Sequence, residues 1–149
     1  MKKSRYRKKE EGKKDSELVM HWEYHQRCDI KNNFGFVYLI TRKETKKAYI
    51  GCKQYFVKKN KKKVESNWEI YTGSNETLNE EIEKLGKKHF QFQIIGEYKN
   101  KRSLRYYECY YQMINHVLTA KLEGTDEAAY YNNYIGGKFY RPVQEPVEL

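Results

Sequence analysis

Hydrophobic and polar residues alternate, or apolar residues form short runs, in three segments of the chain. These segments are 35–41 (GFVYLIT), 48–52 (AYIGC) and 89–95 (HFQFQII). Each is rich in β-branched and aromatic residues, so each predicts a β-strand. The polar sequence RKETKK separates the first two segments, and we expect them to pair as a hairpin. In the third segment, the side chains that share one face are Phe90, Phe92 and Ile94.

A helical pattern follows in the stretch 74–86 (SNETLNEEIEKLG). Ser74 is the expected N-cap of this helix, and Gly86 is a C-cap signal because glycine tolerates the left-handed conformation that ends many helices. The apolar stripe expected to face the core consists of Leu78, Ile82 and Leu85.

Two further helices are predicted, one near each end of the chain. The stretch 101–119 (KRSLRYYECYYQMINHVLT) carries, on one face, Leu104, Tyr107 or Glu108, Tyr111, Ile114 and Leu118. In 15–28 (DSELVMHWEYHQRC), Leu18, Val19 and Trp22 have near-helical spacing, and Asp15 or Ser16 is a possible cap. From Tyr130 onward we expect a short irregular closing segment.

The order of these elements predicts an α+β domain with a small, mostly antiparallel three-stranded sheet flanked by helices. A chain of 149 residues suffices for one domain with one core. We expect a basic disordered tail at 1–14, an N-terminal helix and linker at 15–33, the main domain at 34–140 and a C-terminal tail at 141–149.

The chain is basic, and its charge is uneven. It carries 30 Lys and Arg against 20 Asp and Glu, a formal net charge of +10. Residues 1–14 (MKKSRYRKKEEGKK) hold eight basic and two acidic residues, so this tail has +6 and the rest has +4. A segment with so few apolar residues cannot bury surface, so we expect it to stay disordered until a partner binds. A basic excess attracts polyanions, of which nucleic acid is the most common, and solubility is the alternative explanation.

Other features of the sequence argue against a membrane-spanning, a secreted or a zinc-binding protein. The chain has no run of eighteen apolar residues, which a membrane-spanning helix needs, and its start is too polar for a secretory signal. Its three cysteines, Cys28, Cys52 and Cys109, are far apart, form no zinc-binding spacing and are odd in number. We therefore expect an intracellular protein.

One constellation of residues indicates a function. The sequence Gly35-Phe36-Val37-Tyr38 is followed, after ten residues, by Tyr49-Ile50-Gly51, and both lie on the predicted hairpin. Glu108 then occurs in the predicted helix 101–119, and Asn132 occurs in YYNNYI near the end.

This arrangement resembles the GIY-YIG nuclease family over roughly residues 34–139. Tyr49-Ile50-Gly51 matches letter for letter, whereas the first half has one extra residue if its glycine is aligned, so Tyr38 is aligned instead. The stretch KVESNWEIYTGSN further resembles a phage-encoded branch of small GIY-YIG proteins. If a phage encodes this chain, the expected location is the cytoplasm of a bacterial host. The resemblance implies an endonuclease that hydrolyses DNA, most of all duplex DNA, by water attack that leaves a 5′-phosphate. Such enzymes serve in homing, restriction or degradation of host DNA.

The resemblance also implies roles for individual residues. Glu108, a carboxylate on a helix otherwise rich in aromatic side chains, would be the ligand of Mg²⁺ or Mn²⁺, a hard ion that prefers oxygen. Tyr38 would orient or deprotonate the attacking water, more directly than Tyr49 does. Gly51 would allow close backbone approach. Asn132 matches the terminal asparagine of the family.

The main departure from the family concerns an arginine on the helix after the second motif. Counting from Gly51 leads to Lys58 and Lys59, with no arginine nearby. Lys53, Lys59 and Lys63 are candidates to supply that charge, although lysine lacks the bidentate fork of arginine. Tyr71 would stand where the family has a histidine. The lysines expected to contact phosphates as a group are Lys53, Lys58, Lys59, Lys61, Lys62 and Lys63.

Three hypotheses follow from these observations. The first is a metal-dependent DNA endonuclease, of unknown oligomeric state and with a homodimer as one option. The second is a catalytically inactive nucleic-acid-binding module on the same fold, which the missing arginine favours. The third is a basic structural protein, which composition alone supports.

Overall fold

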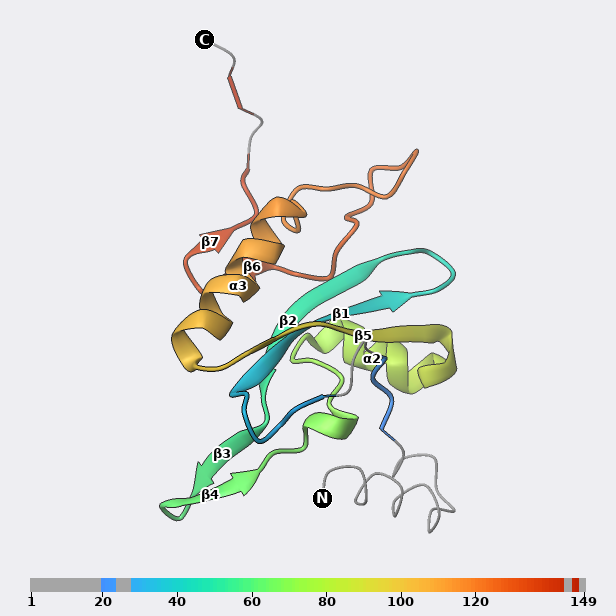
Figure 1. Cartoon of the computed structure of the whole chain (residues 1–149). Helices are drawn as coiled ribbons and strands as arrows, with labels where there is room; N and C mark the ends of the chain where they lie inside the picture. Colours follow the sequence, from blue (N-terminus) through green and yellow to red (C-terminus); the bar gives the residue numbers. More distant parts are fainter. Residues whose placement is uncertain (1–19, 24–27, 144–145, 148–149) are drawn as a thin grey trace.

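The structure is a computed structural model that describes residues 20–23, 28–143 and 146–147 (Figure 1). The predicted tail at 1–14 lies outside the described residues. The described elements, in chain order, are β1 (Gly35–Arg42), β2 (Ala48–Gln54), β3 (Phe56–Lys59), β4 (Lys62–Glu65), the 3₁₀ turn η2 (Trp68–Ile70), α2 (Glu76–Leu85), the 3₁₀ turn η3 (Lys87–His89), β5 (Phe90–Tyr98), α3 (Lys101–Ile114), β6 (Tyr134–Ile135) and β7 (Phe139–Tyr140).

The central sheet has the strand order β2-β1-β5, and all of its pairs are antiparallel. This confirms the predicted α+β class, the three strands and the hairpin between the first two. Tyr38 lies opposite Gly51 in the register of β1 and β2, and Ile40 lies opposite Tyr49. Tyr38 and Tyr49 therefore occupy diagonal positions on one face of the sheet.

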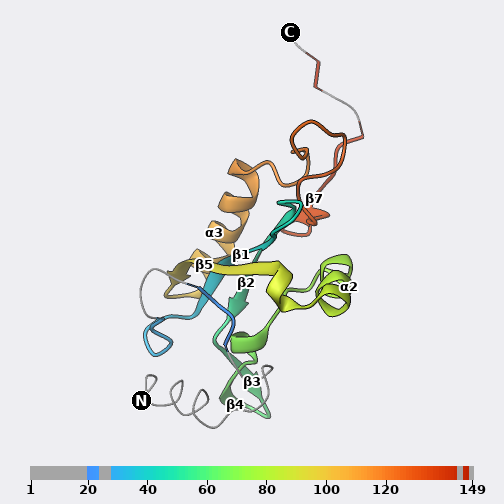
Figure 2. The same cartoon turned by 90° about the vertical axis from the view of Figure 1, so that its right-hand side faces the viewer.

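Successive side chains of β1 point to opposite faces of the sheet, so the core has two layers. Even-numbered side chains such as Phe36 and Ile40 enter an aromatic cluster on one face, together with Trp68 and the apolar side of α2. Val37, on the other face, packs with Leu104 of α3 in a smaller cluster. α2 and α3 accordingly lie on opposite sides of the sheet, as the two views show (Figures 1 and 2).

Both helices form where they are predicted, with differences at their ends. On α3, Ile114 is 51% exposed instead of facing the core with Leu104. The N-cap of α2 is Asn75, not Ser74, because the Asn75 side chain accepts a hydrogen bond of 2.9 Å from the Leu78 N–H. Gly86 ends α2 with φ 99°, as expected. α3 stops at Ile114, five residues before the predicted end, because the next residues turn and His116 has a left-handed φ of 52°.

The helix predicted at 15–28 is wrong for the residues that the structure describes. Trp22 is buried in the aromatic cluster, and its indole N–H donates to the carbonyl of Trp68 at 2.7 Å. Glu23 forms a parallel bridge with Gln93, so the backbone here runs along β5 instead of coiling. Tertiary burial of the tryptophan outweighs the local helical spacing.

The segment rich in lysine forms the two-stranded ribbon of β3 and β4, which extends away from the sheet (Figure 1). Asn60 and Lys61 form its turn with φ of 53° and 65°, the left-handed values that two-residue hairpins use. The closing segment is more ordered than expected, since β6 and β7 pair as a second small hairpin. None of the helices within the described residues has the length and hydrophobicity that crossing a membrane requires.

Candidate active site

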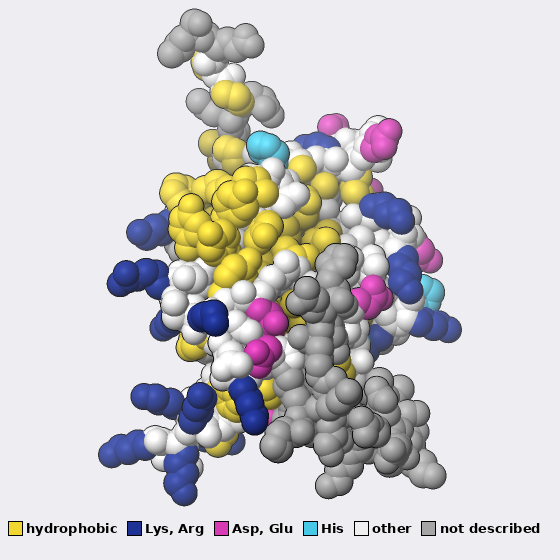
Figure 3. Space-filling view, in the orientation of Figure 1, with side chains coloured by type: hydrophobic (Ala, Val, Ile, Leu, Met, Phe, Trp, Pro, Cys, Tyr) yellow, Lys and Arg dark blue, Asp and Glu magenta, His cyan; other side chains and the backbone are white. Residues whose placement is uncertain are grey.

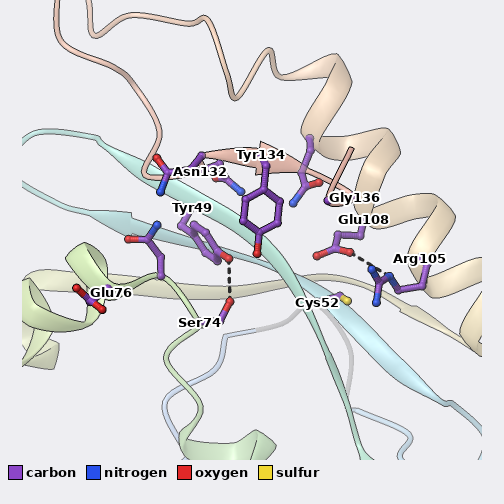
Figure 4. A pocket seen from close by; sticks show the side chains of 13 residues that line it. Tyr49, Cys52, Ser74, Glu76, Arg105, Glu108, Asn132, Tyr134 and Gly136 are labelled. Carbon is purple, nitrogen blue, oxygen red and sulfur yellow. Dashed lines mark hydrogen bonds and ion pairs between the residues drawn. The ribbon is translucent and has the colours of Figure 1, made fainter. Parts of the chain in front are cut away.

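A cavity of about 330 Å³ lies between β2, the start of α2, α3 and β6. Tyr49 and Cys52 of β2 form its floor, Ser74 lies on one side, and Arg105 and Glu108 of α3 lie on the other (Figure 4). Gln112, Asn132 and Tyr134 also line it. Residues distant in sequence thus converge on one small, mostly polar site.

The outer edge of β2 positions this lining. β2 is an edge strand, so its backbone groups that point away from β1 need partners elsewhere. At Ile50, the N–H donates to Asn132 Oδ1 at 3.1 Å, and the carbonyl accepts from Asn132 Nδ2 at 2.9 Å. The same carbonyl accepts from Gln112 Nε2 at 2.9 Å. Asn132 is 2% exposed and uses both amide atoms on β2, so its role in this geometry is to position the strand.

Glu108 contacts the same outer edge of β2, at Cys52. It hydrogen bonds with the backbone and side chain of Cys52, and its side chain is only 17% exposed. Burial raises the pKa of Glu108, while Arg105 and the Cys52 hydrogen bonds act in the opposite direction. Arg105, one helical turn earlier, has its Nε 3.6 Å from Glu108 Oε1 and is 58% exposed. The site therefore offers an anchored carboxylate beside an accessible guanidinium.

The side-chain oxygen atoms of α3 that face the cavity suit a hard divalent cation. Among the described residues, no group of three or more His, Cys, Asp or Glu side chains could hold a metal ion. Two carboxylates line the cavity, Glu76 at the start of α2 and Glu108 on α3. Mg²⁺ commonly binds through one carboxylate with water and phosphate oxygens, and Glu108 is the carboxylate beside Arg105. Gln112, one turn after Glu108, has a buried Oε1 with no hydrogen-bond partner among the described residues. A cation beside Glu108 would give this oxygen a favourable electrostatic neighbour.

Tyr49 faces Glu108 across the cavity. Its hydroxyl lies 3.2 Å from Ser74 Oγ, as the dashed line in Figure 4 marks. Burial raises the pKa of Tyr49 to about 12. Its hydroxyl is therefore neutral at physiological pH and can donate or accept a hydrogen bond in the cavity.

Tyr38 lies beneath Tyr49 and is only 1% exposed. Its ring centroid is 6.1 Å from that of Tyr49 and 6.1 Å from that of Tyr71. A Cβ atom on Gly51 would lie 2.5 Å from the Tyr38 hydroxyl oxygen, so only glycine permits the ring to lie across β2 at this point. Burial raises the pKa of Tyr38 well above its usual range.

Comparison with known protein families decides the assignment. Residues 19–135 match the family model described as "Putative endonuclease segE, GIY-YIG domain". The chain belongs to the GIY-YIG family. Comparisons with curated proteins and with solved structures found no match.

The fold brings together most residues that the GIY-YIG resemblance selects. Tyr49, Glu108 and Asn132 line the cavity, and Gly51 lies under it. The Tyr38 ring lies against those of both Tyr49 and Tyr71, so these three tyrosines adjoin one another. The roles of these residues in catalysis stay predictions.

Two of the lysines proposed from the sequence in place of the GIY-YIG arginine lie away from the cavity. The third, Lys53, has its Nζ 4.0 Å from the centroid of the Tyr71 ring. Lys59 and Lys63 are exposed on the β3–β4 ribbon and do not line the cavity. Lys53 lines a neighbouring cavity of about 270 Å³ together with Lys101 and Arg105. Arg105 lines both cavities and lies next to Glu108. Counting along the sequence from Gly51 did not identify this cation. Its i, i+3 spacing from Glu108 was the available signal.

Proposed function

We propose that this GIY-YIG nuclease domain is a metal-dependent endonuclease that hydrolyses phosphodiester bonds of DNA. One observation supports this most: an anchored carboxylate, an exposed guanidinium and a tyrosine hydroxyl face one cavity, contributed by Glu108, Arg105 and Tyr49. Phosphodiester hydrolysis needs charge neutralisation at the phosphate, an oriented water and a stabilised leaving oxygen.

Glu108 would hold Mg²⁺ or Mn²⁺ at the α3 wall, with water and phosphate oxygens as the remaining ligands. When bound, the ion neutralises phosphate charge and acidifies a coordinated water. Cys52 orients Glu108 through its hydrogen bonds, so the carboxylate is held before substrate arrives. Burial raises the pKa of Glu108, and a cation beside it would act in the opposite direction by favouring the charged carboxylate.

Arg105 takes the part for which the sequence analysis proposed a lysine. Its guanidinium is accessible between the two cavities, with Lys53 and Lys101 in the second one. A strand that passes from one cavity to the other would keep its phosphates near all three cations. Arginine can hold a phosphate through two hydrogen bonds, which fixes the orientation of the reacting group.

We assign the direct contact with the attacking water to Tyr49. The sequence analysis gave this role to Tyr38, whose hydroxyl is buried behind β2. Tyr49 lines the cavity, and its hydroxyl already bonds with Ser74. With its pKa raised to about 12, Tyr49 orients water as a neutral hydroxyl and does not act as a general base in the free protein.

The lysine ribbon supplies affinity for the nucleic acid backbone. Lys58 lies directly opposite Lys63, and Lys59 lies opposite Lys62. Like charges in directly opposed positions repel each other and destabilise a hairpin. A bound polyanion would reduce the repulsion between these lysines. Together with the basic tail at 1–14, it accounts for the sequence-independent part of DNA binding.

The alternative is an inactive nucleic-acid-binding module, and the absence of an arginine after Gly51 favours it. The position of Arg105 beside Glu108 supports the enzyme instead, because it offers a guanidinium from another part of the chain. A supercoiled plasmid incubated with the full chain, with Mg²⁺ or with EDTA, separates the two functions. Nicking only with Mg²⁺ supports the enzyme, whether it serves in homing, restriction or host-DNA degradation. A gel shift without nicking supports the module.

A further inference from the structure

The β6–β7 hairpin presents aromatic side chains at the mouth of the candidate active site. Tyr134 lines the cavity and extends over it, between Ser74 on one side and Glu108 on the other (Figure 4). Tyr140 is the direct cross-strand partner of Tyr134, so both side chains lie on the same face of the hairpin. We refer to these two residues as the tyrosine pair.

The ring faces of the tyrosine pair are available to a ligand. Tyr134 is 50% exposed and Tyr140 is 64% exposed. Their ring centroids are 5.8 Å apart with a 50° angle between planes, so the rings do not stack on each other. In the space-filling view, hydrophobic side chains gather over α3 and β7, and this area is exposed among the residues that the structure describes (Figure 3).

The hairpin that carries this pair is firmly anchored. Ile135 is buried against α3, and a Cβ atom on Gly136 would approach Cys109 Sγ to 3.3 Å. Arg141, just after β7, donates hydrogen bonds to the carbonyls of Leu118 at 2.7 Å, Tyr130 at 3.0 Å and Asn132 at 2.5 Å. Because this arginine fastens the hairpin, the exposed tyrosines form a fixed platform.

Charge and composition favour a nucleobase as the occupant of this platform. Residues 128–144 contain Lys138 and Arg141 and no acidic residue. A second copy of the chain would bring the same positive charge, of +10 overall, against this surface. A nucleic acid strand brings negative phosphates and flat aromatic bases, and bases stack on tyrosine rings without regard to sequence.

We propose that the tyrosine pair stacks on an unpaired base next to the phosphate held in the cavity. The substrate is then a strand whose bases are unstacked beside the scissile bond, either single-stranded nucleic acid or a duplex opened at that point. This inference rests on the proposed nuclease function and specifies its substrate. Tyr134, at the cavity mouth, receives the nearer base, and Tyr140 extends the platform away from the site.

The test measures binding by the full chain in EDTA, where cleavage cannot proceed. The probes are a short single-stranded oligonucleotide, the same backbone with abasic sites, a duplex with a mismatch bubble and the fully paired duplex. Tyr140→Leu keeps an apolar side chain and removes the ring. Phe139→Leu is the matched control, because Phe139 is the adjacent exposed residue, at 55%, on the opposite face of β7. Tyr140→Trp restores an aromatic ring.

We expect Tyr140→Leu to weaken binding of the base-containing strand and the bubble duplex by about tenfold, the effect of losing one stacked base. Binding of the abasic strand should be unchanged, as should all binding by Phe139→Leu, and Tyr140→Trp should bind like the wild type. Preference for the single strand or for the bubble then identifies which source of unpaired bases the enzyme uses.

Three results would overturn the inference. One is equal weakening of the abasic and base-containing strands, and another is no effect of Tyr140→Leu on either. The third is a dimer in sedimentation that Tyr140→Leu dissociates while oligonucleotide binding is unaffected, since a second copy would then be the occupant. A wild-type chain that binds none of the probes would instead refute the proposed function itself.

Discussion

Replacement of Asn132 by alanine tests how the candidate site is held together. The asparagine side chain satisfies both backbone groups of Ile50 on the outer edge of β2, at 3.1 Å and 2.9 Å. Gln112 also donates to the Ile50 carbonyl, so this acceptor keeps a partner in the variant. The Ile50 N–H has no such substitute in the described contacts and would be buried without an acceptor.

The magnitude follows from these two bonds. A buried donor left unsatisfied costs about 1–3 kcal/mol, and the second bond, whose acceptor keeps Gln112, contributes about 1 kcal/mol. Asn132→Ala should therefore lower the free energy of unfolding by about 2–4 kcal/mol. For a domain of this length, that corresponds to a fall in Tm of roughly 6–12 °C.

Thermal unfolding followed by circular dichroism measures this directly, and Asn132→Asp is the informative companion. Its carboxyl keeps an acceptor for the Ile50 N–H but, when ionised, has no proton for the carbonyl. Burial raises the pKa of such a carboxyl, so its protonated, stabilising form is present at low pH. The stability deficit of Asn132→Asp should thus be small at low pH and grow as pH rises through the raised pKa.

An Asn132→Ala protein that melts at the wild-type temperature would refute this reasoning. If that protein also lost cleavage, Asn132 would contact the reacting groups and would not act through β2.

Three other variants test the assignments in the site and on the ribbon. Arg105→Lys keeps the charge and loses the two-point fork, so cleavage should fall about tenfold or more in a single-turnover assay; an undiminished rate would contradict its role. Tyr49→Phe should slow cleavage by about 10²-fold, and Tyr38→Phe by much less, whereas the opposite order would return the water contact to Tyr38. The double variant Lys59→Ser/Lys62→Ser should raise Tm by removing a like-charge pair. It should also reduce the log–log salt slope of DNA binding by about 1.8 if each lysine neutralises one phosphate, and an unchanged slope would place the ribbon away from DNA.

The sequence predicts the central fold well because the sheet and helices depend on local patterns. Phe90, Phe92 and Ile94 alternate with polar residues, and all three are buried as the period requires. The helix prediction fails at the described residues 20–23 because Trp22 is buried by residues distant in sequence, and periodicity carries no information about that contact. Ser74 and Asn75 are both good N-caps, so propensity alone does not choose between them.

The candidate site was predictable in part for the same reason. Tyr49 and Glu108 carry the family pattern, and both reach the cavity. Arg105 was not predicted because the family arginine was sought by counting along the chain from Gly51, whereas the Arg105 guanidinium reaches the site from α3. The hydrogen bonds from Asn132 to β2 could not be predicted either, because the unpaired edge of β2 exists only once the sheet has formed.

The account depends most on Glu108 as the metal ligand of an active nuclease. The most direct measurement is nicking of supercoiled plasmid in Mg²⁺ by Glu108→Gln, with Glu80→Gln, an exposed α2 carboxylate outside the cavity, as the control. A gel shift in EDTA verifies that each protein still binds DNA. The account predicts that Glu108→Gln binds as well as wild type, or slightly better for the loss of a negative charge, yet nicks at least about 10²-fold more slowly, while Glu80→Gln nicks normally. Wild-type nicking by Glu108→Gln would contradict it.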